Sequence, residues 1–151
     1  MELQSHRGYR TPAGSFWHIY TDFPALYDRF ALSTLEAAKK VHQLIDFTGA
    51  RVLDIASGTG KNAFEHAKLA RSVIGIEPFE TMRDFAIARA RARGVANVEF
   101  RDGIAEDLSM FGEDSFDVAV SMYGHLSRGI RMTASCADAN GSCAAVVTSS
   151  S

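Results

Sequence analysis

Residues 51–60 combine an acidic side chain, hydroxyl side chains and glycines at a spacing that can bind a nucleotide-type cofactor. An apolar run that contains Asp54 leads into small residues, among which Gly58 and Gly60 stand two positions apart. Glycine has no Cβ, so the backbone can approach a ligand closely where a strand passes into a helix. In a parallel α/β sheet such turns lie at the carboxyl ends of the strands, where cofactors bind. The stretch therefore predicts a cofactor site.

Two phosphate-binding patterns compete for this turn. The P-loop pattern G-x-x-x-x-G-K-S/T is rejected, because Ile55 occupies its first glycine position and Asn62 replaces its magnesium-binding hydroxyl. The dinucleotide pattern G-x-G-x-x-A is satisfied by residues 58–63. Glu77 also follows about 20 residues later, where that pattern places a ribose-binding acid.

The charge of Asp54 argues against the dinucleotide. A pyrophosphate would bring negative charge to a strand end that already carries a carboxylate, in a site where like charges repel more strongly than in water. A cationic ligand reverses the sign of this interaction. Asp54 therefore favours a cationic cofactor over NAD.

Length and composition set wide limits. The chain has 151 residues, of which 46% are hydrophobic and 23% charged, with a net charge of -2. These values are typical of one globular domain and give no electrostatic reason to expect nucleic acid as a partner. We see no secretory leader or membrane-spanning run, so we expect a cytoplasmic protein without a membrane partner. Cys136 and Cys143 lack the spacing of metal ligands, so no metal site is expected.

Alternating strands and helices must position the turn. Periodicity predicts a helix that starts at the capping box 33–36 and ends near Thr48-Gly49, with Leu44 on its apolar face, and further helices over 61–70 and 79–93. In the second helix Phe64 and Leu69 are expected to point inward. Strands are expected over 51–56, 72–77, 97–101 and 116–121, with a weaker apolar run over 144–147. This order predicts βαβ units and a mainly parallel sheet.

Several segments of the sequence together resemble the motifs of a known protein family. Residues 52–60, Val-Leu-Asp-Ile-Ala-Ser-Gly-Thr-Gly, resemble motif I of the class I S-adenosylmethionine-dependent methyltransferases, V-L-D-x-G-x-G-x-G, with Ala56 in place of the first glycine. Residues 73–78 resemble the second motif, 103–108 resemble the G-D-A-E-x-L segment, 115–117 match S-F-D, and 27–31 resemble the Y-D-x-x-A segment that closes over the cofactor. The resemblance covers roughly residues 27–126. It implies a three-layer Rossmann-like α/β sandwich with a mainly parallel sheet.

The resemblance also implies which residues contact S-adenosylmethionine. The strand-end acid of the second motif binds both ribose hydroxyls, which a two-oxygen carboxylate can do. Ile104 stands where the family commonly has an Asp for the adenine amino group, so Asp102 or backbone around Ala105 is expected to take that role. The implied cofactor-binding residues are Tyr27, Asp54, Ala56, Ser57, Gly58, Gly60, Glu77, Pro78, Asp102, Ile104, Ala105 and Ser121.

No catalytic residue is assigned from the sequence. His125 follows the fourth predicted strand and could act as a base, but a solvated loop histidine is the preferred interpretation. Arginines cluster in the helix over 79–93, where acidic neighbours favour a solvated face over a nucleic-acid patch. The expected partner is a small-molecule methyl acceptor; nothing in the sequence predicts an oligomeric state.

Three segments are expected along the chain. Residues 1–32 are an aromatic-rich cap, 33–131 form the S-adenosylmethionine-binding domain, and 132–151 are an atypical tail rich in alanine and serine. The tail lacks the family's last strands, so we expect a truncated carboxyl end, produced by a frameshifted or abnormally terminated reading after about Arg128. The expected function is methyl transfer to a small molecule. A non-catalytic module derived from a methyltransferase is the alternative, and an NAD-binding domain is less favoured.

Overall fold

The computed structural model describes residues 22–30, 34–112, 115–122, 135–137 and 143–148. The helices are α2 (Pro24–Phe30), α3 (Thr34–Leu44), α4 (Lys61–His66) and α5 (Glu80–Arg93). The strands are β1 (Arg51–Ile55), β2 (Ser72–Ile76), β3 (Val98–Arg101), β4 (Val118–Ser121), β5 (Ser135–Ala137) and β6 (Cys143–Thr148). No helix among these residues is long and apolar enough to cross a membrane.

One six-stranded sheet organises the chain, in the order β3-β2-β1-β4-β6-β5. The first four strands in this order are parallel, and β6 and β5 are antiparallel to their neighbours. This confirms the predicted α/β class with a mainly parallel sheet. The weak apolar run over 144–147 lies in β6, whereas β5 was not predicted.

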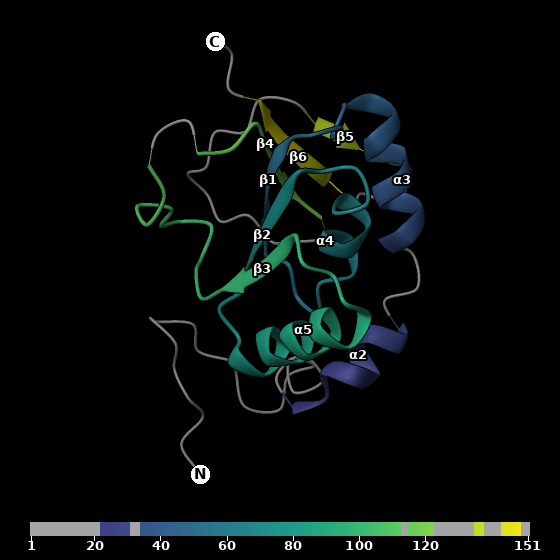
Figure 1. Cartoon of the computed structure of the whole chain (residues 1–151), viewed down its shortest axis with the longest axis vertical. Helices are drawn as coiled ribbons and strands as arrows, with labels where there is room; N and C mark the ends of the chain where they lie inside the picture. Colours follow the sequence, from purple (N-terminus) through teal and green to yellow (C-terminus); the bar gives the residue numbers. More distant parts are fainter. Residues whose placement is uncertain (1–21, 31–33, 113–114, 123–134, 138–142, 149–151) are drawn as a thin grey trace.

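Helices α3, α4 and α5 cover one face of this sheet (Figure 1). Apolar side chains of α3, α4 and α5 form a single buried cluster with alternate residues of all four parallel strands, because successive strand residues point to opposite faces. The members from the strands are Val52, Val73, Phe100, Val118 and Val120.

The opposite face is covered differently in the described part of the chain. Leu53, Ile55 and Ile76 are buried there, and the loop that follows β3 packs on them through Ala105 and Leu108, among others. In Figure 1 this loop lies on the side of the sheet away from α3 and α4. Among the described residues, the loop after β3 occupies the place of the expected third layer.

The prediction that Leu44 and Leu69 point into the core was wrong. Leu69 is 43% exposed because α4 already ends at His66, so Leu69 lies in the turn that follows. Leu44 is 62% exposed as the last residue of α3, which ends four residues before Thr48. The predicted end of α5 is confirmed, with Gly94 as its C-cap at a φ of 63°. Ser33, the first residue of the predicted capping box, lies outside the described residues.

Candidate cofactor site at the carboxyl edge of the sheet

The turn after β1 requires left-handed backbone at three positions. Ala56, Gly58 and Gly60 have φ values of 58°, 55° and 80°. Glycine adopts this conformation without strain, whereas an alanine costs roughly 1–2 kcal/mol there. Ala56 thus keeps the shape of the turn, as predicted, at a cost in backbone strain.

Asp54 is the second-last residue of β1, close to this turn, and is 1% exposed. Burial raises the pKa of its carboxyl to about 8, and the nearby charge of Glu77 adds to this, against a smaller opposing hydrogen bond from the Ala63 backbone. Its Oδ2 atom is buried and has no hydrogen-bond partner within the described part of the chain. An unpartnered carboxylate oxygen at this depth is unfavourable unless a ligand satisfies it.

Glu77 follows β2 and is equally buried, at 1% exposure. Its two oxygens accept hydrogen bonds from the backbone N–H groups of Gly58 at 2.9 Å and Phe79 at 3.0 Å. Burial raises the pKa of this carboxyl to about 7, while both hydrogen bonds and Arg83 act in the opposite direction. Each oxygen keeps a further lone pair, so the carboxylate can still accept from two hydroxyl groups.

The hydrogen bonds of the turn distinguish between the two cofactor classes. The N–H of Ser57 donates to the Ile76 carbonyl, that of Gly60 to the Ser57 carbonyl, and that of Gly58 to Glu77. A dinucleotide site needs such N–H groups for its pyrophosphate. Here three of them are engaged within the protein, and the acceptor of one is a carboxylate. The turn is therefore suited to a cation.

Strand register brings the remaining site positions to the same edge. Ile55, the last residue of β1, pairs with Ile76 of β2 on one side and with Ser121 of β4 on the other. Ser121 is 1% exposed, and its hydroxyl is buried without a partner among the described residues. Two unsatisfied polar atoms, Oδ2 of Asp54 and Oγ of Ser121, thus belong to adjacent strands at one edge.

The residues expected around an adenine follow β2 and β3. Pro78 is half-buried beside Glu77, and Ile104 and Ala105 are half-buried in the loop after β3. Asp102 is more open: its side chain is 43% exposed, and Oδ1 lies 3.6 Å from a guanidinium nitrogen of Arg83. The same arginine donates to the Glu77 carbonyl at 2.8 Å, so it links the two strand ends.

Tyr27 lies half-buried in α2, and its neighbour Asp28 was not predicted as a site residue. The Asp28 carboxylate accepts a hydrogen bond from the Thr59 hydroxyl at 2.6 Å, inside the glycine turn. Within the Y-D-x-x-A segment, the resemblance implied a cofactor contact for Tyr27 alone. The contact of Asp28 depends on a partner 31 residues away, which no local pattern reveals.

Packing beneath the turn requires two glycines. A Cβ on Gly60 would lie 2.6 Å from the Phe100 ring, and one on Gly75 would lie 2.7 Å from that ring and from Ser57 Oγ. The Gly60 position is therefore fixed by its φ and by Phe100 packing. The sequence did not predict a requirement for glycine at position 75, because that requirement comes from the ring of Phe100 on β3.

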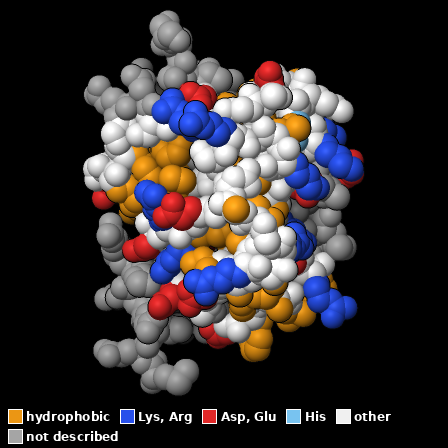
Figure 2. All heavy atoms as spheres, in the orientation of Figure 1, with side chains coloured by type: hydrophobic (Ala, Val, Ile, Leu, Met, Phe, Trp, Pro, Cys, Tyr) orange, Lys and Arg blue, Asp and Glu red, His pale blue; other side chains and the backbone are white. Residues whose placement is uncertain are grey.

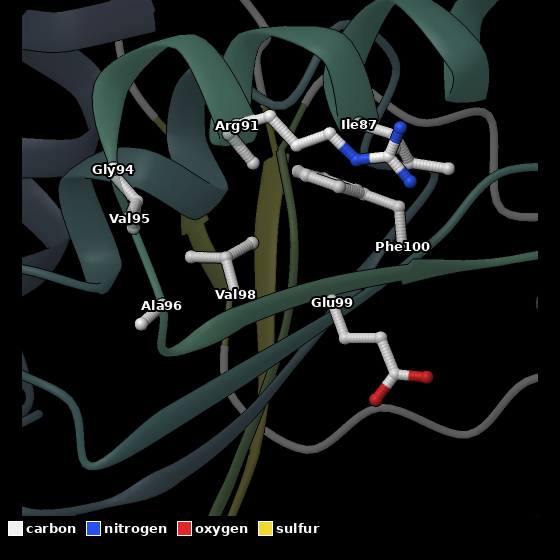
Figure 3. Close-up of a pocket in the computed structure, with 9 residues that line it drawn as sticks. Ile87, Arg91, Gly94, Val95, Ala96, Val98, Glu99 and Phe100 are labelled. Carbon is white, nitrogen blue, oxygen red and sulfur yellow. The ribbon is translucent and has the colours of Figure 1, made fainter.

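An apolar groove runs between α5 and β3 on the far side of Phe100 (Figure 3). It is lined by Ile87, Ala90, Arg91, Gly94, Val95, Ala96, Val98, Glu99 and Phe100. None of the predicted cofactor-binding residues lines it. The groove is therefore separate from the carboxyl-edge site.

The predicted solvated arginine face was wrong for two residues. Arg83 and Arg89 are only 15% and 17% exposed in their side chains and are paired with Asp102 and Asp28. Arg91 and Arg93, in the last turn of α5, are exposed as expected. The partners of the first two lie on other elements, so sequence neighbours did not reveal them. His125 lies outside the described residues.

Comparison with known proteins assigns this arrangement to a family. The model of the methyltransferase domain family matches residues 52–140, more than half of the chain. The uncharacterized methyltransferase YcgJ of Bacillus subtilis is 38% identical over 73 residues, 48% of this chain and 28% of that protein. The demethylmenaquinone methyltransferase of Lactococcus lactis is 31% identical over 115 residues, 70% of this chain and 45% of that protein.

Solved structures agree. The YcgJ crystal structure matches with a TM-score of 0.56 and 31% identity, over 59% of this chain and 38% of that chain. A Pyrococcus horikoshii protein matches with a TM-score of 0.52 and 31% identity, over 68% of this chain and 46% of that chain. The chain thus spans less than half the length of these proteins. With its strand order, glycine turn and paired strand-end acids, the chain belongs to the methyltransferase domain family, as a class I S-adenosylmethionine-dependent member.

Proposed function

We propose that this chain forms the cofactor-binding part of an S-adenosylmethionine-dependent methyltransferase that acts on a small molecule. The observation that carries the proposal is the hydrogen bond from the Gly58 N–H to the Glu77 carboxylate, next to the buried carboxyl of Asp54. Two acids at one turn, three of whose N–H donors are already engaged, favour a cation and disfavour a pyrophosphate. The unpartnered oxygen atoms of Asp54 and Ser121 fit a polar ligand at this edge.

The expected binding residues are distributed along the cofactor. Asp54 and the turn formed by residues 56–60 hold the methionine half, together with Ser121. Glu77 binds the ribose hydroxyls, while Pro78, Asp102 and residues 104–105 surround the adenine. The proposed units are an amino-terminal cap segment, residues 1–32, and a binding domain, residues 33–131. The segment 132–151 contributes β5 and β6 to the sheet of that domain.

The cofactor supplies a methyl group already activated by its positive sulfur. The chain's own residues therefore need to bind, orient and exclude water rather than create a strong electrophile. Holding two reactants in the right geometry can contribute about 7–11 kcal/mol to lowering a barrier. A carboxyl edge with buried acids provides the fixed geometry that this requires.

The small-molecule acceptor is supported by the names of two relatives. Demethylmenaquinone methyltransferase and arsenite methyltransferase are named for small acceptors, and both relatives exceed 30% identity in the matched region. The two names give different acceptors, so the proposal extends to the class of small molecules and not to one compound. Transfer of a labelled methyl group to quinols, arsenite and a protein mixture tests the class. Labelling of protein alone contradicts a small-molecule acceptor, and binding without any transfer favours a non-catalytic module.

Substitution of Glu77 tests the cofactor assignment. In Glu77→Ala, loss of the ribose-binding acid should weaken S-adenosylmethionine binding by about 2 kcal/mol, roughly thirtyfold in Kd. Isothermal titration calorimetry of wild type and variant measures this. Glu99→Ala is the matched control, because Glu99 is an exposed acid on the neighbouring β3. An affinity that stays the same in Glu77→Ala would contradict the assignment.

A further inference from the structure

Helix α2 is attached to the molecule in an unusual way. It has seven residues and buries none of them. Three large apolar side chains in the helix or directly before it are exposed: Phe23 by 57%, Leu26 by 41% and Phe30 by 70%. Figure 2 shows hydrophobic side chains at the surface in the lower part of the molecule, where Figure 1 places α2. Apolar burial therefore contributes little to the position of this helix.

Polar contacts of Asp28 connect the helix to the rest of the molecule. The Oδ1 atom of Asp28 accepts hydrogen bonds from the Thr59 hydroxyl at 2.6 Å and from the Arg89 guanidinium at 2.7 Å. Lys61 Nζ donates to the Asp28 carbonyl oxygen and lies 3.8 Å from its Oδ2. The Asp28 side chain is only 16% exposed, so these charge-assisted bonds are largely shielded from water.

The partners of Asp28 are themselves fixed. Thr59 is 3% exposed and stands between the two glycines of the turn. Arg89 lies on α5 with its guanidinium carbon 5.5 Å from the ring centres of both Phe64 and Phe85, and it also donates to the Thr59 carbonyl at 3.4 Å. One carboxylate thus joins α2, the glycine turn and α5.

We propose that Asp28 is a positioning residue of the cofactor site, which locks α2 and the Gly58–Gly60 turn together so that both hold the bound S-adenosylmethionine. This inference rests on the proposed function. It follows from the contacts above, because the same carboxylate binds the turn and α5, and because Tyr27 directly precedes Asp28 on α2. Loss of the carboxylate would loosen α2 and leave the charges of Lys61 and Arg89 beside a site for a cation.

The two substitutions Asp28→Ala and Asp28→Asn separate the contribution of the hydrogen bond from that of the negative charge. The amide keeps an oxygen that can accept from Thr59, but it loses the charge that holds Lys61 and Arg89. We expect Asp28→Ala to weaken S-adenosylmethionine binding about tenfold or more and Asp28→Asn to give an intermediate loss. Asp84→Asn is the matched control, because it removes an exposed carboxylate from α5.

Hydrogen exchange distinguishes positioning from general destabilisation. In the cofactor-free protein, Asp28→Ala should exchange the amides of residues 26–30 about tenfold faster than wild type, while those of β1 and β2 keep their rates. S-adenosylmethionine should slow exchange in α2 of wild type and of Asp84→Asn, and do so less in Asp28→Ala. If β1 and β2 exchange faster to the same degree as α2, Asp28 has only a structural role and the proposal is wrong.

The outcomes also separate this proposal from the proposed function. A wild-type protein that binds no S-adenosylmethionine overturns the proposed function and, with it, the role of Asp28 in cofactor binding. Binding by wild type together with a Kd within twofold of it in Asp28→Ala overturns the role of Asp28 alone. The expected combination is tight binding by wild type and the control, weak binding by Asp28→Ala, and partial recovery in Asp28→Asn.

Discussion

Asp54 and Glu77 are two acids that the fold buries side by side at the ends of neighbouring strands. Burial disfavours the charged form of each, and their mutual repulsion adds to this for Asp54. Raised pKa values mean that the folded chain binds more protons than the unfolded chain. The stability from this source is fully present below about pH 4, where the unfolded acids are protonated, and is lost progressively as the pH rises to about 7 to 8.

A cationic cofactor should reverse this effect and release protons on binding. Positive charge beside Asp54 and Glu77 stabilises their ionised forms, so the Kd for S-adenosylmethionine should fall as the pH rises from about 6 to 8, by at most about tenfold per pH unit for each proton released. Calorimetry near neutral pH in two buffers of different ionisation enthalpy counts the protons. The Glu77→Gln variant, which lacks one of the acids, should release fewer. Equal heats in both buffers would contradict coupling between these acids and the cofactor.

Ala56 gives a second test at this scale. Its φ of 58° is strained for alanine, so Ala56→Gly should stabilise the protein by about 1 kcal/mol in urea unfolding. Gly94→Ala is the matched opposite, because Gly94 has a φ of 63° and open space where a Cβ would lie. That variant should lose a similar amount. Destabilisation by Ala56→Gly would show that the turn does not need left-handed backbone there.

Between elements, α3 and α4 meet through a pair of histidines. His42 Nε2 lies 2.8 Å from His66 Nδ1, and the Phe47 ring stacks on His66 at a centroid distance of 4.8 Å. His66 is fully buried, and burial lowers its pKa to about 3 from an ordinary 6.5, with the neighbouring His42 adding to the shift. The fold therefore holds His66 neutral.

Acid should weaken the contribution of this buried histidine to stability. Because the unfolded chain binds the His66 proton below pH 6.5, the contribution of His66 to the free energy of unfolding should drop by about 1.4 kcal/mol per pH unit as the pH falls from about 6.5 toward 3, while Asp54 and Glu77 act in the opposite direction. Urea unfolding at several pH values measures the slope. The free energy of unfolding of wild type, relative to that of His66→Phe, which can still stack on Phe47, should therefore fall by about that amount per pH unit. An unchanged slope would assign the acid sensitivity to other groups.

The elements were predictable to the extent that their signals are local. The apolar runs of β1, β2 and β4 identify strands directly, and Gly94 ends α5 by its backbone preference. Arg89 is largely buried because it pairs with Asp28, which lies on another element. Position 75 requires a glycine because the Phe100 ring, from a neighbouring strand, occupies the space of a side chain. Tertiary partners of this kind leave no periodic pattern. The same holds for β5, three residues long, which exists through its pairing with β6.

For the whole molecule, the parallel order β3-β2-β1-β4 brings the ends of three motifs to one edge. Asp54, Glu77 and Ser121 are far apart in the sequence but lie in or directly after adjacent strands, so a single ligand can contact all three. The site is therefore a property of the sheet and not of the glycine turn alone. On the edge that faces away from β1, β4 pairs with the antiparallel strand β6.

The central claim is that this edge selects a cationic adenosyl cofactor. Titration of the wild-type chain with S-adenosylmethionine and, separately, with NAD in the same calorimeter and buffer tests it most directly. We expect saturable binding of S-adenosylmethionine at least about tenfold tighter than that of NAD, because the acids favour a cation and the turn's N–H donors to a pyrophosphate are largely engaged within the protein. Saturable binding of NAD alone would contradict the claim.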